Sequence, residues 1–283
     1  MSPKRKMFDT LGGDVQAIAA GELHDALWEI TSGMSCFGPR PEWTDWFHHL
    51  LGQLVPRSHE NWFHYLLEDL ISAFISVYPN GIESEPYPGF RWDALNTLGR
   101  CIMDRTCWSD GRIIVGEILH GGEDCWGFWH WFEASGDFSA SMFFYLKYLS
   151  PEQIDTWMKS ALRIDCPHWR AQVMVWFVGA YGVLVGDIRQ PSKFKSHGTP
   201  SIDWEGSYLL DGNYTGDFSK NPEIEHFLPE RNRLQALVTV DSFVTEDVFL
   251  EWSLSVAEYD YLERELGNLP DQFRDLYMSS GPH

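Results

Sequence analysis

The sequence lacks the features of a disulfide-stabilised or membrane-spanning protein. Its five cysteines are an odd number and include no Cys-x-x-Cys pair, which disfavours a disulfide framework and a cysteine-rich zinc site. The longest stretch without a charged residue, 171–186, is shorter than the roughly 20 apolar residues that a membrane span needs. A secretory signal is also missing, because Asp9 and Asp14 interrupt the segment that would have to be apolar. We therefore expect a cytoplasmic protein in which 171–186 forms a buried helix.

Basic residues are scarce as well, with 21 Lys and Arg against 41 Asp and Glu, a net charge of −20. Nucleic acids and anionic membranes repel such a polyanion, so we expect no direct binding to either. The sequence also contains no G-x-S-x-G elbow, no P-loop and no G-x-G-x-x-G loop. We accordingly expect no cofactor. The scattered cysteines and the absence of a second Glu-x-x-His pair predict no bound transition metal.

Apolar residues make up 44% of the chain and aromatics 15%, enough for a sizeable core. Between 43 and 186 the apolar residues recur at the 3–4 residue spacing of helices. Ser150-Pro151-Glu152-Gln153 has the pattern of a capping box with proline in the first helical position. The sequence predicts a mainly α protein of antiparallel helix pairs, forming an irregular HEAT-like solenoid or a helical bundle.

Four segments differ in composition. They are an N-terminal lead-in at 1–42, a helical-pair domain at 43–186, a Pro/Gly-rich ordered loop or hairpin insert at 187–230, and an acidic helical segment at 231–283 packed on the main domain. Asp211-Gly212 lies between two groups of strand-forming residues, which predicts either a small β-hairpin near 207–215 or an ordered surface loop. A further helix is expected over about 112–119.

One group of residues has the composition of a metal site. Glu117 and His120 have the Glu-x-x-His spacing that places both side chains on one helix face, and Glu123 and Asp124 follow closely. These four residues are the candidate site of a metal-dependent enzyme. The alternative is a helix C-terminus, capped by His120, followed by a solvated turn.

A second histidine lies between two carboxylates. Glu60, His64 and Glu68 are spaced at i, i+4 and i+8, so they share one face of a helix. Such a group could hold a metal or act as a base. The alternative interpretation is an exposed polar stripe opposite the apolar face.

Tryptophan is unusually frequent, with 14 residues in the chain, and five aromatics gather in the segment Trp126–Phe132. Exposed tryptophans would suit a surface that binds a sugar or a protein. Large exposed apolar patches are uncommon on soluble monomers, so we expect the cluster to be largely core.

Negative charge concentrates near the C-terminus. Residues 201–283 hold 17 acidic and 5 basic residues, which is 12 of the 20 net negative charges in less than a third of the chain. A helix is predicted over Thr245–Leu266, with Thr245 as its cap. Its aromatic face would be buried, and the opposite face would display four carboxylates, Asp247, Glu251, Glu258 and Glu265. This stripe is either a solvated face or a docking surface for a basic partner.

These patterns favour a non-enzymatic acidic helical protein that binds a basic protein through Asp247, Glu251, Glu258 and Glu265. The most concrete form is an immunity or antitoxin protein that inhibits a nuclease, because a nuclease presents a cationic surface to phosphate. The alternatives are a metal-dependent enzyme with its site near Glu117–Asp124, and a solenoid scaffold or adaptor.

Overall fold

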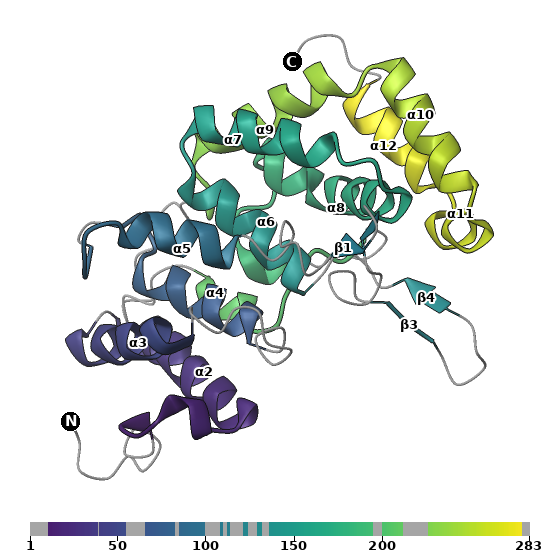
Figure 1. Ribbon diagram of the computed structural model, residues 1–283. Coiled ribbons are helices and arrows are strands. Elements are labelled where there is room, and N and C mark those ends of the chain that lie inside the picture. Colours follow the sequence, from purple (N-terminus) through teal and green to yellow (C-terminus); the bar gives the residue numbers. More distant parts are fainter. Residues whose placement is uncertain are drawn as a thin grey trace.

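The structure is a computed structural model in which the chain folds into packed α-helices (Figure 1). It describes residues 11–38, 40–54, 66–82, 85–99, 108–109, 112–113, 121–123, 129–131, 136–194, 200–211 and 226–278. For 108–109, 112–113, 121–123 and 129–131 only the backbone is described. The described part contains eleven α-helices, so the prediction of a mainly helical protein is confirmed.

The first helices of the chain form one end of the molecule. They are α2 (Ala20–Phe37), α3 (Pro41–Leu54), α4 (Leu67–Val77) and α5 (Phe90–Leu98), preceded by a 3₁₀ turn, η1 (Val15–Ala17). α2 packs mainly against α4, and α3 lies against both. Apolar residues at helical spacing explain this packing: Leu23, Leu27 and Ile30 of α2 are fully buried.

The middle of the molecule is built from α6 (Asp137–Tyr148), α7 (Pro151–Leu162) and α8 (Pro167–Val185). The predicted capping box is confirmed: the Gln153 amide donates to the Ser150 hydroxyl at 3.3 Å, and the Ser150 amide donates to the Gln153 side chain at 3.0 Å. α8 is apolar on nearly all sides and is largely buried, as expected for the uncharged stretch 171–186.

α9 (Glu230–Phe243) joins the ends of two earlier helices. The Asn232 amide donates to the carbonyls of Leu146 and Leu149 at 2.8 and 2.9 Å, where α6 ends. The Arg233 guanidinium donates to the carbonyl of Leu184 at 2.8 Å, in the last turn of α8. The last carbonyls of a helix have no partner within it, so these bonds satisfy groups that burial would otherwise leave unpaired. These hydrogen bonds also explain why two polar side chains of α9, Asn232 and Arg233, are buried.

Short antiparallel strands lie within the segment 43–186, which the sequence predicted to be a helical-pair domain. β1 (Trp108–Ser109) pairs with β2 (Arg112–Ile113), and β3 (Gly121–Glu123) pairs with β4 (Trp129–Trp131). The helix expected over about 112–119 is therefore wrong at its start, because the backbone at 112–113 is extended and pairs with 108–109. The rest of that segment lies outside the described residues.

The predicted hairpin at 207–215 is also wrong in its first arm. Residues 207–210 form a 3₁₀ helix, η6 (Ser207–Leu210), and not a strand. Gly206 precedes it with a φ of 76°, a left-handed conformation that suits glycine, and the Ser207 hydroxyl donates to the Asp203 carboxylate. These turn-forming contacts curl the chain, and η6 packs beside η5 (Pro191–Lys193). Residues 212–215 lie outside the described part.

The last three helices are α10 (Glu246–Ala257), α11 (Asp260–Leu266) and α12 (Leu269–Tyr277). The single helix predicted over Thr245–Leu266 is thus corrected to two helices that meet at Glu258 and Tyr259. Tyr259 has an extended backbone, with φ −117° and ψ 101°. After the bend, α11 buries Leu262 and Leu266 and packs against α8.

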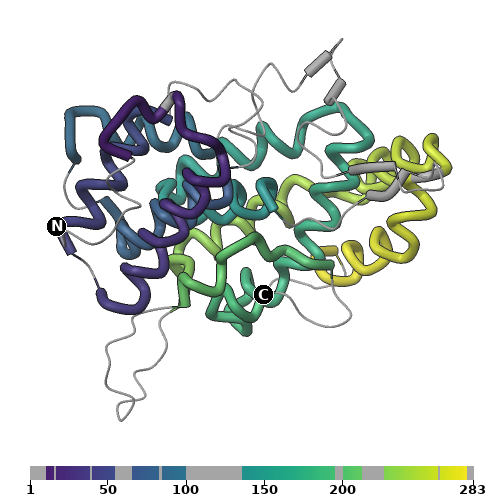
Figure 2. Tube along the Cα trace, turned by 90° about the horizontal axis from the view of Figure 1, so that it is seen from below, coloured from purple at the N-terminus to yellow at the C-terminus, as the bar shows by residue number. Residues whose placement is uncertain are grey.

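The helices follow one another across the molecule, from α2 and α3 at one end to α10, α11 and α12 at the other (Figures 1 and 2). This order does not establish a HEAT-like solenoid, which stays a prediction, as does the division into four segments. Among the described residues, no helix combines the length and the apolar character required to cross a membrane.

Candidate partner-binding surface on α10

α10 is anchored at its start and along its inner face. The Thr245 hydroxyl accepts a hydrogen bond from the Val248 amide at 3.4 Å, which confirms the predicted cap. Phe249 and Trp252 point inward and lie against the ring of Phe273 from α12. The outer face of α10 is therefore held in a fixed orientation on the molecule.

The four carboxylates predicted to bind a partner divide between two helices. Asp247 and Glu251 lie on α10, and Glu258 continues its helical backbone for one residue at the C-cap. All three residues are exposed. Glu265 lies on α11 instead, where its side chain is only 23% exposed and its carboxylate is 3.8 Å from the Arg264 guanidinium. The bend at Tyr259 thus separates Glu265 from the other three.

Glu251 has a partner within the chain. Its carboxylate lies 2.6 Å from the Arg170 guanidinium, which is only 6% exposed. Arg170 also donates to the Ser255 hydroxyl at 2.9 Å and lies 3.1 Å from the Asp165 carboxylate. A nearly buried guanidinium needs such partners, because an uncompensated charge is costly to remove from water. Glu251 therefore joins α10 to the start of α8, whereas among the described residues no ion pair involves Asp247 or Glu258.

Two leucines lie between these carboxylates. Leu250 and Leu254 are 58% and 62% exposed, a turn apart on α10. At 100° per residue from Asp247, they fall at about 300° and 340°, and Glu251 falls at about 40°.

We call Asp247, Leu250, Glu251, Leu254 and Glu258 the α10 face. It combines exposed apolar area with negative charge, a composition that suits a protein interface better than a purely solvated surface. The leucines were not among the residues predicted from the sequence, although their i, i+4 spacing opposite the buried face is visible there.

The residues of the alternative metal site are not brought together by any described contact. Glu117, His120 and Asp124 lie outside the described residues, and Glu123 is described only as backbone in β3. Within the described part of the chain, no group of three or more His, Cys, Asp or Glu residues is arranged to hold a metal ion. The Trp126–Phe132 cluster is described only at 129–131, as backbone, so its burial stays a prediction.

A separate polar cluster lies where α2, α4 and the 200–211 segment meet. No local spacing in the sequence predicts it. His24 Nδ1 is 2.7 Å from the Asp69 carboxylate, and the Glu205 amide donates to the Glu68 carboxylate at 2.5 Å. The predicted partners of Glu68, namely Glu60 and His64, lie outside the described residues. Glu68 itself is half-buried, and not part of an exposed stripe.

Burial dominates the electrostatics of this cluster. It raises the pKa of Glu68 from 4.5 to about 8, helped by the carboxylates of Asp137 and Asp69. Burial likewise raises the pKa of Asp69 to about 6, against the effect of its hydrogen bond to His24. Burial opposes protonation of His24, but the hydrogen bond to Asp69 and the nearby carboxylates leave the pKa of His24 raised. The cluster therefore holds protons near neutral pH and couples the 200–211 segment to α2 and α4.

Comparison with known proteins identifies no relative: no family model, no curated protein and no solved structure matches this chain.

Proposed function

We propose that this protein is a non-enzymatic binding protein whose α10 face docks on a basic protein partner. The observation that carries the proposal is the pair of exposed leucines, Leu250 and Leu254, set among Asp247, Glu251 and Glu258 on an anchored helix. The apolar area would be the part removed from water on binding, and the carboxylates would select a cationic partner and speed its approach.

The most concrete form of this proposal is an immunity or antitoxin protein that covers the cationic surface of a nuclease. The net charge of −20 supports it, because charge of one sign steers an oppositely charged partner over long distances. A scaffold or adaptor would also use a protein-binding face, but it would not abolish the activity of its partner. The inhibition of nuclease activity by the purified protein separates the two.

The proposal is tested by capture from the source cells with two matched variants. Asp247→Lys with Glu258→Lys reverses charge on the α10 face, and Asp45→Lys with Asp187→Lys makes the same change at exposed carboxylates elsewhere. We expect wild type and the control to retain one basic protein that the α10 variant loses. Equal retention by all three proteins would place the binding surface elsewhere.

The metal-dependent alternative has its own test. Elemental analysis that finds about one zinc or iron per chain, lost in His120→Ala, would favour an enzyme with a site at Glu117, His120, Glu123 and Asp124. A metal-free protein that still captures its partner would support the binding function.

A further inference from the structure

The 200–211 segment is fixed to helices from two parts of the molecule. The Trp204 indole N–H donates to the Ser72 hydroxyl of α4 at 2.8 Å. The Gly136 amide, at the start of α6, donates to the Asp203 carbonyl at 2.9 Å. The segment therefore joins the end of the molecule that contains α4 to the middle, which contains α6.

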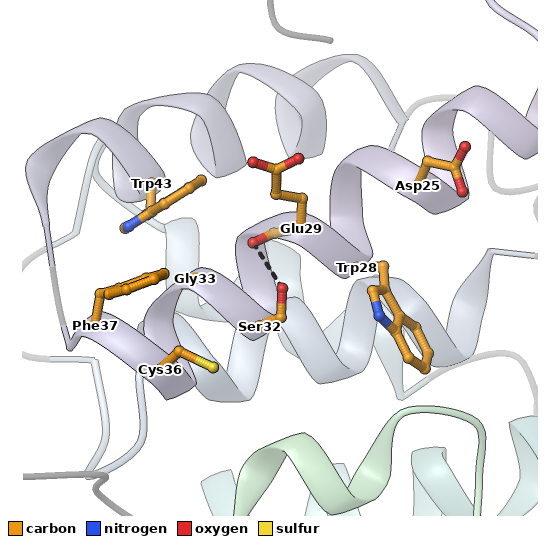
Figure 3. Close-up of a pocket in the computed structure, with 8 residues that line it drawn as sticks. All are labelled: Asp25, Trp28, Glu29, Ser32, Gly33, Cys36, Phe37 and Trp43. Carbon is orange, nitrogen blue, oxygen red and sulfur yellow. Dashed lines mark hydrogen bonds between the residues drawn. The ribbon is translucent and has the colours of Figure 1, made fainter. Parts of the chain in front are cut away.

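The same segment packs on Trp28, whose side chain projects from α2 (Figure 3). An added Cβ at Gly206 would come within 2.9 Å of the Trp28 indole, and the Tyr208 ring lies 6.1 Å from it, centroid to centroid. Trp28 is also one wall of a pocket of about 380 Å³ along α2. The position of the segment thus fixes a side chain that shapes this pocket.

Acidic side chains predominate where the segment meets α2 and α4. The Glu68 carboxylate accepts the Glu205 amide, and the Asp69 carboxylate lies 2.7 Å from His24 Nδ1. The other charged groups that act on Glu68, Asp69 and His24 are Asp25 of α2, Asp137 of α6 and Glu205 of the segment. α3 and α5 also pack on α4, but among the described residues they contribute no charge to this cluster.

Protonation relieves the repulsion between these carboxyl groups. Burial raises the pKa of Glu68 to about 8 and that of Asp69 to about 6, and neighbouring carboxylates contribute to both. Burial opposes protonation of His24, but its hydrogen bond to Asp69 leaves the pKa of the imidazole raised. All three groups therefore hold protons more tightly under the segment than in water. Detachment of the segment releases these protons, so a rising pH favours detachment.

We propose that the 200–211 segment is a proton-controlled latch, which is closed on α2 and α4 while the cluster holds its protons and opens as the cluster loses them. Opening takes Trp204 away from Ser72 and frees the Trp28 ring from Gly206. The state of the latch therefore changes one wall of the α2 pocket. The latch is at the opposite end of the molecule from α10 (Figures 1 and 2), so it does not depend on the function proposed for the α10 face.

The test is amide hydrogen exchange of the full-length protein at pH 6, 7 and 8, followed by mass spectrometry of its peptides. Protection factors are compared, because they remove the intrinsic dependence of exchange on pH. With a pKa of about 8 for Glu68 in the closed state and 4.5 in water, the open fraction should grow at least about 50-fold between pH 6 and pH 8. The peptide with the Glu205 amide should lose protection by this factor, while α8 stays more protected at each pH.

Two matched variants assign the effect to the cluster. Glu68→Gln keeps an acceptor for the Glu205 amide but cannot ionise, so its change in protection should fall to about 5-fold or less. Glu22→Gln, at an exposed position on α2, should behave as wild type.

Three results would overturn the latch. In wild type, the segment and α8 could show equal protection at every pH, so that the segment opens only with the whole protein, or the protection of the segment could be independent of pH. These two comparisons need no variant, so they decide the matter even if Glu68→Gln does not fold. The third result is a Glu68→Gln variant that keeps the pH dependence of wild type.

Discussion

The half-buried carboxyl of Glu68 gives the strongest quantitative prediction about stability. Its pKa rises from 4.5 to about 8 on folding, so between these values the folded state binds a proton that the unfolded state has lost. Stability therefore falls as pH rises through this window. Each pH unit in this window lowers the free energy of unfolding by about 1.4 kcal/mol. At pH 7 the accumulated loss is therefore about 3 kcal/mol. Glu68→Gln removes this cost and keeps an oxygen that can accept the Glu205 hydrogen bond.

We expect Glu68→Gln to match wild type near pH 4.5 and to be more stable at pH 7 by about 1–3 kcal/mol. Urea denaturation at several pH values measures the difference, provided that the slope against denaturant is unchanged. Glu22→Gln, at an exposed position on α2, is the control and should stay within about 0.5 kcal/mol of wild type at each pH. A Glu68→Gln variant that is equally or less stable at pH 7 would refute the argument that Glu68 is protonated in the folded protein at this pH.

Two further predictions concern packing and charge. Glu251→Ala should destabilise the protein by about 1–3 kcal/mol in thermal unfolding, because it removes a partner of the nearly buried Arg170 guanidinium. An unchanged melting temperature would mean that the other partners of Arg170 are enough to stabilise its charge. Gly33→Ala should cost about 1–3 kcal/mol because its Cβ meets the Trp43 ring. Gly52→Ala is the control, because it lies in a helix and its new Cβ has nothing within 4 Å; it should stabilise the protein by up to about 1 kcal/mol. Equal effects of the two substitutions would contradict the close contact between Gly33 and the Trp43 ring.

Helices with local signals were predictable from the sequence. The capping box at Ser150 and Gln153, the cap at Thr245 and the uncharged stretch 171–186 all act within a few residues of the structure they specify. Caps and apolar spacing depend on neighbours along the chain, so a single sequence is sufficient to locate them.

The bend between α10 and α11 could not be predicted in this way. Residues 245–266 contain no glycine or proline to interrupt the helical pattern. The chain turns at Tyr259 because α11 then packs on α8, and the Tyr259 ring lies 5.2 Å from that of His168. A tertiary contact therefore overrides a continuous local pattern, and the predicted line of four carboxylates loses Glu265.

The candidate site was predictable only in part for the same reason. The outward direction of Asp247 and Glu251 follows from helical periodicity. The pairing of Glu251 with Arg170 joins residues 81 positions apart, and that of His24 with Asp69 joins residues 45 positions apart. No local spacing encodes such contacts, so the distinction between a carboxylate that serves the fold and one that faces solvent required the structure.

The central claim, that the α10 face binds a basic protein, is tested most directly by association kinetics with the captured partner at increasing salt. We predict that wild type and Asp45→Lys with Asp187→Lys associate rapidly at low salt and lose affinity as salt rises. Asp247→Lys with Glu258→Lys should bind at least about 10-fold more weakly at low salt and respond little to salt. If this variant instead binds with the rate, the affinity and the salt dependence of wild type, the α10 face is not the binding surface.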